Sequence, residues 1–377
     1  MKKLLFIDRD GVLLQEPPED YQVDSYEKFK LVPGCISALR DIVALKTYEL
    51  VMVTNQDGLG TDSYPEDTFW GPQNLLLEIL ESEGIRFRNV HIDRSFPHEN
   101  KPTRKPGTAM LTEYLHGEFD LEKSFVIGDR KTDMLLARNL GAKGILLGQS
   151  IDPLDQRETG TEDWAGSVAL RANTWAEIRD YLVGLPRKVT YERDTHETKI
   201  KLSLDLDGSG QSQISTGLSF FDHMLDQIAR HGGIDLVLEV DGDLHVDEHH
   251  TVEDTGLALG AAFREAMGAK IGMARYGFSL PMDDCRALVL MDFGGRPWFL
   301  WDVKFLRDRI GDVPTEMFSH FFKSFSDEAR MNLQIDARGE NDHHKIESIF
   351  KAFARALKSA IRRDKNDLTL ASTKGVL

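Results

Sequence analysis

The chain has 377 residues, enough for two or three domains with their own cores, and its formal net charge is −16 at pH 7. The acidic excess is spread along the chain, which argues against sequence-independent binding to nucleic acid. Its two distant cysteines, Cys35 and Cys285, exclude a disulfide framework, and no apolar run is long enough for a signal peptide or a membrane span, so we expect a cytoplasmic protein that does not bind membranes.

The first 150 or so residues alternate short apolar runs with amphipathic stretches, which is typical of a parallel sheet covered by helices. Strands are expected at residues 4–7, 50–53, 90–92, 124–127 and 144–147, and helices at 33–46, 73–83, 107–116 and 131–140. This pattern predicts an α/β domain.

A polar, acidic stretch at residues 149–166 and a last helix at 174–183 precede Gly184, Leu185 and Pro186, where we place the domain boundary. The domains expected are therefore residues 1–185 and 187–377. In the second, alternating strands at 198–206, 234–240, 287–293 and 331–336 and two long helices at 252–267 and 346–362 predict an α+β domain with half-exposed sheets.

Chemically active side chains follow the expected strands of the first domain. Asp8 and Asp10 come directly after the first strand, where residues i and i+2 share a face and point into the crevice in which α/β sheets bind ligands. One carboxylate can attack phosphorus while the other protonates the leaving alkoxide and then activates water, and Mg²⁺ suits an all-oxygen site. The later members of this set are Thr54, Asn55, Lys105, Asp129 and Asp133.

These residues stand in four motifs: Asp8-x-Asp10-Gly11, Thr54-Asn55, Arg104-Lys105-Pro106 and Gly128-Asp129-x-x-Thr132-Asp133. The four motifs, in this order, resemble the haloacid dehalogenase superfamily of phosphatases, which implies a Rossmann-like fold. The resemblance makes Asp8 the nucleophile and Asp10 the acid/base, with Thr54, Asn55 and Lys105 binding the phosphate. It implies that Asp8, the carbonyl of Asp10, and Asp129 hold the magnesium ion. Asp133, four residues after Asp129, either lies behind the metal ligands without binding the metal itself or caps the following helix.

A repeated histidine motif marks the second domain. His249-His250-x-x-Glu253 recurs 94 residues later as His343-His344-x-x-Glu347, and a lone histidine precedes each copy, at His223 and His320. Adjacent histidines on a helix diverge by about 100°, so they tend to serve different metals. Six imidazoles and two carboxylates divide into two sites of about four ligands each, a set that suits Mn²⁺, Fe²⁺ or Zn²⁺ with positions left open for substrate. The roles of His196, His231 and His245 stay open.

The stretches around these histidines, together with residues 217–227 and Ser372-Thr373-Lys374-Gly375, resemble imidazoleglycerol-phosphate dehydratase over residues 187–377. That family implies a duplicated ferredoxin-like (ribosomal-protein-S5-domain-2-like) fold and a 24-subunit homo-oligomer with two Mn²⁺ ions per site at subunit contacts. Its acid/base matches Glu197, and Gln227 would orient the substrate. Its metal ligands match His223, His249, His250, Glu253, His320, His343, His344 and Glu347, and its phosphate contacts match Arg275, Arg296, Lys351, Ser372 and Lys374. Dehydration needs the imidazole as an electron sink, and divalent ions on its nitrogens favour the imidazolate.

The whole chain is similar to bifunctional enzymes that catalyse two steps of histidine biosynthesis, which implies imidazole glycerol phosphate and histidinol phosphate as substrates. Glu16 would pair with the amine of histidinol phosphate. Many such enzymes have a zinc loop, Cys-x-His-x5-Cys-x-Cys, before the Arg-Lys-Pro motif. Asp93, Ser95, Lys101 and Thr103 stand at its four ligand positions, so we expect no zinc and a loop held by packing of Phe96 and Pro97.

Two alternatives remain open at this point. The first domain could act on another small phosphate ester, because the paired aspartates select phosphoryl transfer but not the leaving group. The second domain could be a structural metal-binding assembly module, although structural sites are usually closed whereas these ligands leave positions open.

Overall fold

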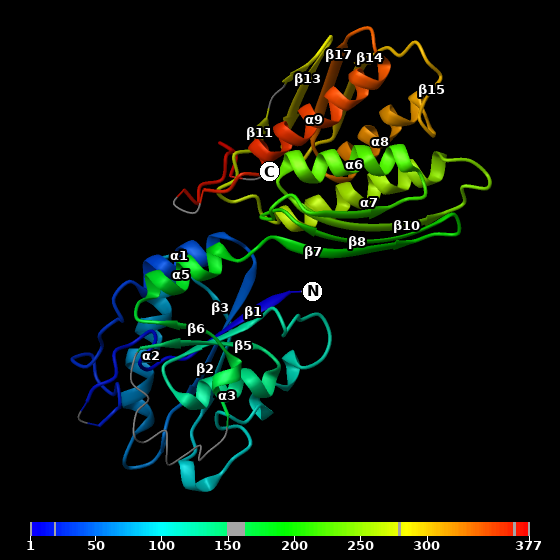
Figure 1. The fold of residues 1–377 in the computed structure, drawn as a ribbon. Coiled ribbons are helices and arrows are strands. Elements are labelled where there is room, and N and C mark those ends of the chain that lie inside the picture. Colours follow the sequence, from blue (N-terminus) through cyan, green and yellow to red (C-terminus); the bar gives the residue numbers. More distant parts are fainter. Residues whose placement is uncertain (1, 19, 149–162, 278–279, 365–366, 376–377) are drawn as a thin grey trace. The chain divides into compact units, whose positions relative to one another are not determined.

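The computed structural model describes residues 2–18, 20–148, 163–277, 280–364 and 367–375, and the chain divides into two compact units, Met1–Gly184 and Leu185–Leu377. The first unit is built on a six-stranded parallel sheet in the order β3-β2-β1-β4-β5-β6 (Figure 1). Its strands are β1 Lys3–Ile7, β2 Tyr48–Asn55, β3 Phe87–Asp93, β4 Phe125–Gly128, β5 Lys143–Leu147 and β6 Val168–Ala172. The strand order reverses between β1 and β4, so a crevice opens at their carboxyl ends.

Helices cover this sheet, and alternate strand residues face each layer. Leu4, Phe6, Val51 and Val126 pack on one face against α3 and the 3-10 helix η2, while α1 and α5 pack together on the other side (Figure 1). The helical segments are α1 Cys35–Ala44, α2 Glu66–Ser82, η1 Pro97–Glu99, η2 Ala109–Tyr114, α3 Lys131–Leu140, η3 Ala165–Ser167 and α5 Trp175–Gly184.

Two helix predictions for the first unit are wrong in part. The helix expected at residues 107–116 is only the short η2, in which Leu111 has non-helical dihedral angles. The helix expected from residue 73 begins at Glu66, and Pro72 lies inside it. Proline normally marks a helix boundary because it lacks the N–H donor, which is why the sequence predicted a later start.

In the described residues of the second unit, two large sheets enclose the long helices α6, α7, α8 and α9 (Figure 1). The first sheet has the order β7-β8-β10-β9, and the second β11-β13-β17-β14 with β12 added to β13. Their strands are β7 Lys188–Asp194, β8 Thr198–Asp205, β9 Ser212–Ser215, β10 Asp235–Gly242, β11 Tyr276–Gly277, β12 Leu280–Met282, β13 Cys285–Asp292, β14 Trp298–Val303 and β17 Asn332–Arg338, with a small pair β15 Arg309–Ile310 and β16 Val313–Pro314. The helices are α6 Ser219–Gly232, α7 His249–Met267, α8 Thr315–Glu328 and α9 Asp342–Ala360.

Of these four helices, the sequence pattern predicts only α7 and α9; α6 and α8 were not expected. The buried residues of α6 and α8 recur at helical spacing, as Phe221, Met224, Leu225 and Ile228 do in α6. Phenylalanines of α8 and α9 pack ring to ring in the core, with Phe321 and Phe350 stacked at 5.6 Å between centroids. The motif histidines therefore stand on rigid, well-packed helices.

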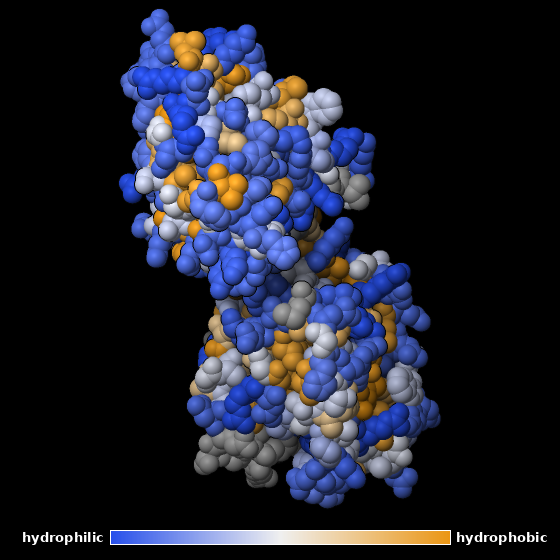
Figure 2. All heavy atoms as spheres, turned by 90° about the vertical axis from the view of Figure 1, so that its right-hand side faces the viewer, coloured by the Kyte–Doolittle hydropathy of each residue, from blue (hydrophilic) through white to orange (hydrophobic). Residues whose placement is uncertain are grey.

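The side chains seen in Figure 2 are mostly hydrophilic, with hydrophobic patches between them. In the part of the chain that the structure describes, no helix combines the length and apolar character needed to cross a membrane.

Candidate active sites

The side chains predicted for phosphoryl transfer converge at the carboxyl end of the parallel sheet. Lys105 Nζ lies 2.8 Å from Asp8 Oδ2, and Asp10 accepts a hydrogen bond from Gln56 Nε2 at 2.6 Å. They border a cleft of about 810 Å³, which is also lined by Thr54, Asn55, Glu16 and Arg130. Asn55 exchanges hydrogen bonds with the backbone of Lys105, so its side chain fixes that lysine's position.

A buried acidic cluster lies beside the nucleophile candidate. Carboxylate oxygens of Asp8, Asp129 and Asp133 all lie within 4.8 Å of one another, and Asp129 Oδ1 is buried without a hydrogen-bond partner among the described residues. Burial, followed by the neighbouring charge of Asp8, raises the pKa of Asp129 well above its usual range. Such a cluster fits a hard divalent cation, which would relieve the repulsion. At Gly11, a Cβ would stand 2.0 Å from Asp129 Oδ2, so only glycine leaves room there.

Asp133 caps helix α3, which is one of the two roles that the sequence left open, and it also contacts Lys105. Its Oδ2 accepts a hydrogen bond from the backbone N–H of Arg130 at the start of α3, which caps the helix. Its Oδ1 lies 2.7 Å from Lys105 Nζ, and both side chains are almost fully buried. Lys105 therefore bridges Asp8 and Asp133.

Glu16 does not present a free carboxylate to the cleft. It forms an ion pair with Arg130 at 2.6 Å, and burial raises its pKa to about 7 although Arg130 opposes the shift. A substrate amine would have to displace Arg130 from Glu16 to bind there.

Hydrogen bonds close the loop where relatives are expected to hold zinc. The Asp93 carboxylate accepts hydrogen bonds from the backbone N–H of Ser95 at 2.9 Å, from the Ser95 hydroxyl, and from Thr103 Oγ1 at 2.5 Å. Phe96 also stacks on His98 with centroids 5.6 Å apart, so the packing that we hypothesised is joined by this polar clasp of Asp93, Ser95 and Thr103. Neither cluster of possible metal ligands in the described residues lies in this loop.

We predict that Asp93→Ala lowers the free energy of unfolding of the first unit by about 2–4 kcal/mol, because buried donors lose their acceptor. Thermal unfolding of the full chain measures this, and Asp93→Asn, which keeps one acceptor oxygen, is the matched control and loses less. Stability recovered in Asp93→Ala on adding zinc would contradict this account of the loop.

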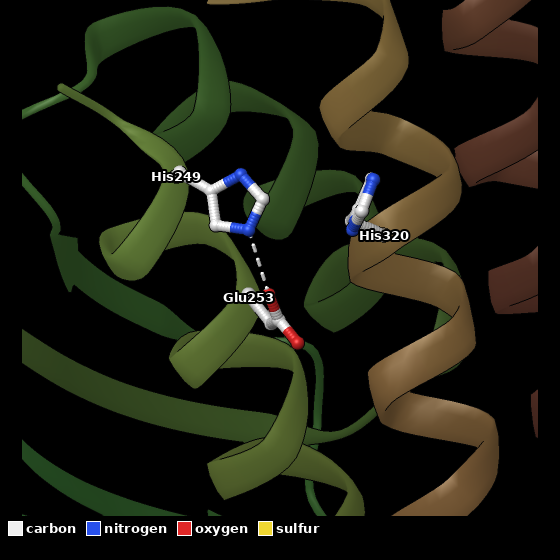
Figure 3. A group of neighbouring side chains, drawn as sticks. All are labelled: His249, Glu253 and His320. Carbon is white, nitrogen blue, oxygen red and sulfur yellow. Dashed lines mark hydrogen bonds and ion pairs between the residues drawn. The ribbon is translucent and has the colours of Figure 1, made fainter.

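Histidines of the repeated motif gather across the two halves of the second unit. His249 Nε2 lies 2.9 Å from Glu253 Oε2 on α7, and His320 from α8 completes a group whose ligand atoms lie within 4.8 Å (Figure 3). The lone histidine of the second half thus joins the paired motif of the first half, because α7 packs on α8.

The second set of ligand candidates, around His343 and Glu347, also combines residues from both halves of the unit, since α6 of the first half packs on α9 of the second half. His343 Nε2 lies 3.8 Å from Glu347 Oε2. Burial raises the pKa of Glu347, but the hydrogen bond and charge of Lys351, with smaller contributions from the charges of His343 and His223, lower it overall. Gln227, one turn from His223 on α6, has its Nε2 3.5 Å from the His223 ring. This set is looser than the first.

The other histidine of each pair turns away, as divergence on a helix predicts. His250 Nδ1 lies 3.0 Å from Asp243 Oδ2, and His344 Nδ1 lies 2.8 Å from Asp284 Oδ1. Such carboxylate partners orient an imidazole so that its Nε2 can bind a metal. The sequence alone does not mark Asp243 or Asp284 as partners of these histidines, because the positions of their loops depend on tertiary structure.

The residues expected to bind substrate are spread over several elements of this unit. Glu197 stands at the β7–β8 turn, with Oε1 3.7 Å from His250 Nε2. Arg275 forms a two-pronged ion pair with Asp292 and donates to the carbonyl of Ala371, the residue before Ser372. Lys351 lies 2.8 Å from Glu347, and the backbone carbonyl of Arg296 accepts a hydrogen bond from Asn332.

Comparisons with known proteins agree with this division. Residues 216–357 match the family described as imidazoleglycerol-phosphate dehydratase, and residues 102–165 match the family described as HAD-hydrolase-like. The "Histidine biosynthesis bifunctional protein HisB" of Spirosoma linguale is 56% identical over 382 residues, with 100% of both chains covered. The chain belongs to this bifunctional histidine biosynthesis family. The Bacteroides fragilis member is 55% identical over 377 residues, again with 100% of both chains covered.

A solved structure, imidazoleglycerol-phosphate dehydratase from Staphylococcus aureus, is 35% identical, covers 47% of this chain and 100% of its own, and has a TM-score of 0.43. As a member of the bifunctional family, the chain is an enzyme of histidine biosynthesis that joins a histidinol-phosphatase to an imidazoleglycerol-phosphate dehydratase. Both parts belong to metal-dependent families, in agreement with the two ligand clusters.

Proposed function

We propose that Asp8 of the first unit attacks the phosphorus of L-histidinol phosphate and becomes an aspartyl-phosphate, which water then hydrolyses. Asp10 protonates the leaving alkoxide and afterwards takes a proton from the attacking water. The observation that carries this proposal is the convergence of Asp8, Asp10, Thr54 and Lys105 on one cleft. Thr54 and Lys105 donate hydrogen bonds to the phosphoryl oxygens.

Asp8, the carbonyl of Asp10, and Asp129 would hold a Mg²⁺ ion, with Asp133 as a further neighbour. The unpaired, buried Asp129 oxygen supports this assignment. When bound, the ion supplies positive charge that offsets the charge of the phosphoryl group. Burial and the neighbouring charge of Asp8 both disfavour the charged form of Asp129, and a bound cation would offset this penalty.

For the second unit, we propose dehydration of imidazole glycerol phosphate to imidazole acetol phosphate. Glu197 takes the proton from the carbon next to the departing hydroxyl, and Gln227 orients the substrate. Arg275, Arg296, Lys351, Ser372 and Lys374 bind the phosphate; the proximity of Arg275 to the Ser372 segment supports this grouping. The carrying observation is the His249, Glu253 and His320 cluster.

The eight metal-ligand candidates are His223, His249, His250, Glu253, His320, His343, His344 and Glu347, and they fit two Mn²⁺ ions. When bound, these ions stabilise negative charge on the imidazole of the substrate. His250 and His344 turn away from the other ligand candidates of the same chain and contact Asp243 and Asp284 instead. This supports a site in which the second histidine of each pair binds a metal shared with a neighbouring copy of the chain.

We propose a homo-oligomer built through the second unit, of 24 copies as the resemblance to imidazoleglycerol-phosphate dehydratase implies. Exposed apolar residues on the outer face of the β13-β17-β14 sheet, Leu288, Leu290, Trp298 and Leu300, are consistent with contacts between copies. Helix α7 packs on α8 and α6 packs on α9, so each pair joins one helix from each half of the unit between the same two sheets. This symmetry supports a duplicated ferredoxin-like unit.

The substrate assignment of the first unit is tested by a panel of phosphate esters with the full chain and Mg²⁺. We expect L-histidinol phosphate to have a kcat/KM at least about tenfold above sugar phosphates, because its ammonium group can pair with carboxylates that line the cleft and a neutral sugar cannot. Preference for another ester would replace the substrate but keep the phosphoryl-transfer chemistry.

A further inference from the structure

Arg9, between the two aspartates of the first motif, is turned into the protein rather than into the cleft. Its side chain is completely buried, and its guanidinium lies 4.9 Å from the centre of the Phe69 ring. Burying a guanidinium costs free energy that an apolar side chain at the same position would not cost. Its presence therefore requires a specific use for the charge or for its hydrogen bonds.

The guanidinium is directed at Asp10. Arg9 Nη1 donates to Asp10 Oδ1 at 2.9 Å and to Oδ2 at 3.0 Å, and it lies 3.5 Å from Gln56 Oε1. Asp10 is itself only 12% exposed. A charge-assisted contact to both oxygens fixes the plane of a carboxylate more closely than a single hydrogen bond does.

Gln56, which is also buried, completes the arrangement. Its Nε2 donates to Asp10 Oδ2 at 2.6 Å and to Thr54 Oγ1 at 2.8 Å. The Thr54 hydroxyl oxygen accepts this bond, so the Thr54 hydroxyl hydrogen can donate to a phosphoryl oxygen. One amide thus links the proposed acid/base to a proposed phosphate donor.

We propose that Arg9 and Gln56 are positioning residues that hold Asp10 in the orientation from which it protonates the leaving alkoxide. The inference rests on the role proposed above for Asp10. In the first step an oxygen of Asp8 bonds to phosphorus, the bond from phosphorus to the alkoxide oxygen breaks, and the proton of Asp10 passes to that oxygen. A nitrophenolate leaving group is stable as an anion and does not need this proton, so its departure does not depend on how the Asp10 carboxyl group is oriented.

The test compares the first turnover of L-histidinol phosphate and p-nitrophenyl phosphate by the full chain with Mg²⁺. In Arg9→Met and in Gln56→Leu we expect histidinol release to slow by about 100-fold, with KM changed less than about threefold, while nitrophenolate release slows by less than about fivefold. Arg9→Lys, which keeps a charge, recovers part of the loss. Arg179→Met is the control, because Arg179 is a partly buried arginine paired with Asp41 at 2.9 Å outside the cleft.

Equal slowing for both substrates, or no slowing for either, overturns the inference. If Arg9→Met does not fold, as measured by thermal unfolding, the Gln56→Leu variant decides the matter. An Asp10→Asn variant that still turns over histidinol phosphate would instead show that the proposed role of Asp10 is wrong, which distinguishes the two failures.

Discussion

Asp8→Asn is expected to reduce phosphate release from L-histidinol phosphate by at least about 10³-fold while dehydration of imidazole glycerol phosphate is unchanged. An amide oxygen is a poor nucleophile, so no aspartyl-phosphate forms, although the side chain keeps its size. Phosphate release and dehydration are measured on the same preparation of full-length protein.

The matched control for this variant is Asp41→Asn, which removes a partly exposed carboxylate that pairs with Arg179 rather than with Lys105. It should leave both activities within about twofold. Histidinol-phosphatase activity that survives in Asp8→Asn would show that the nucleophile lies elsewhere in the cleft.

His320→Asn is expected to reduce dehydration by more than about 100-fold, with phosphate release unchanged, because it removes a ligand from the group that includes His249 and Glu253. The manganese content of the purified protein should fall with the activity. His223→Asn, the counterpart in the other half of the unit, should behave in the same way.

His116→Asn controls for the loss of an exposed histidine in the first unit and should leave the manganese content unchanged. Normal dehydration by His320→Asn, with full manganese, would exclude His320 from the metal site.

Much of the phosphatase site could be predicted, because its residues follow directly on apolar strands. Asp8, Thr54 and Asp129 stand at or just after the ends of β1, β2 and β4, and parallel strands bring their carboxyl ends to one edge of the sheet. The sequence could not predict which of these side chains contact one another. Whether Lys105 contacts Asp8, Asp133 or both depends on the path of a long loop.

The dehydratase site shows a similar limit. The repeat identified the histidines, but it did not show that His320 joins His249 rather than His343, since that depends on which helices pack together. Helices α6 and α8 were missed although their apolar residues have helical spacing. Arg9 was visible in the sequence as well, but a charged side chain after a strand is normally solvated, so its burial could not be inferred.

The chain carries two clusters of possible metal ligands, and we propose that its phosphatase site works with Mg²⁺ and without a zinc loop. The most direct test is phosphate release from L-histidinol phosphate by the full chain after removal of all metals and addition of Mg²⁺ alone. We predict that Mg²⁺ restores the activity and that zinc adds nothing. Activity that returns only when zinc is present would contradict the account of the loop closed by Asp93.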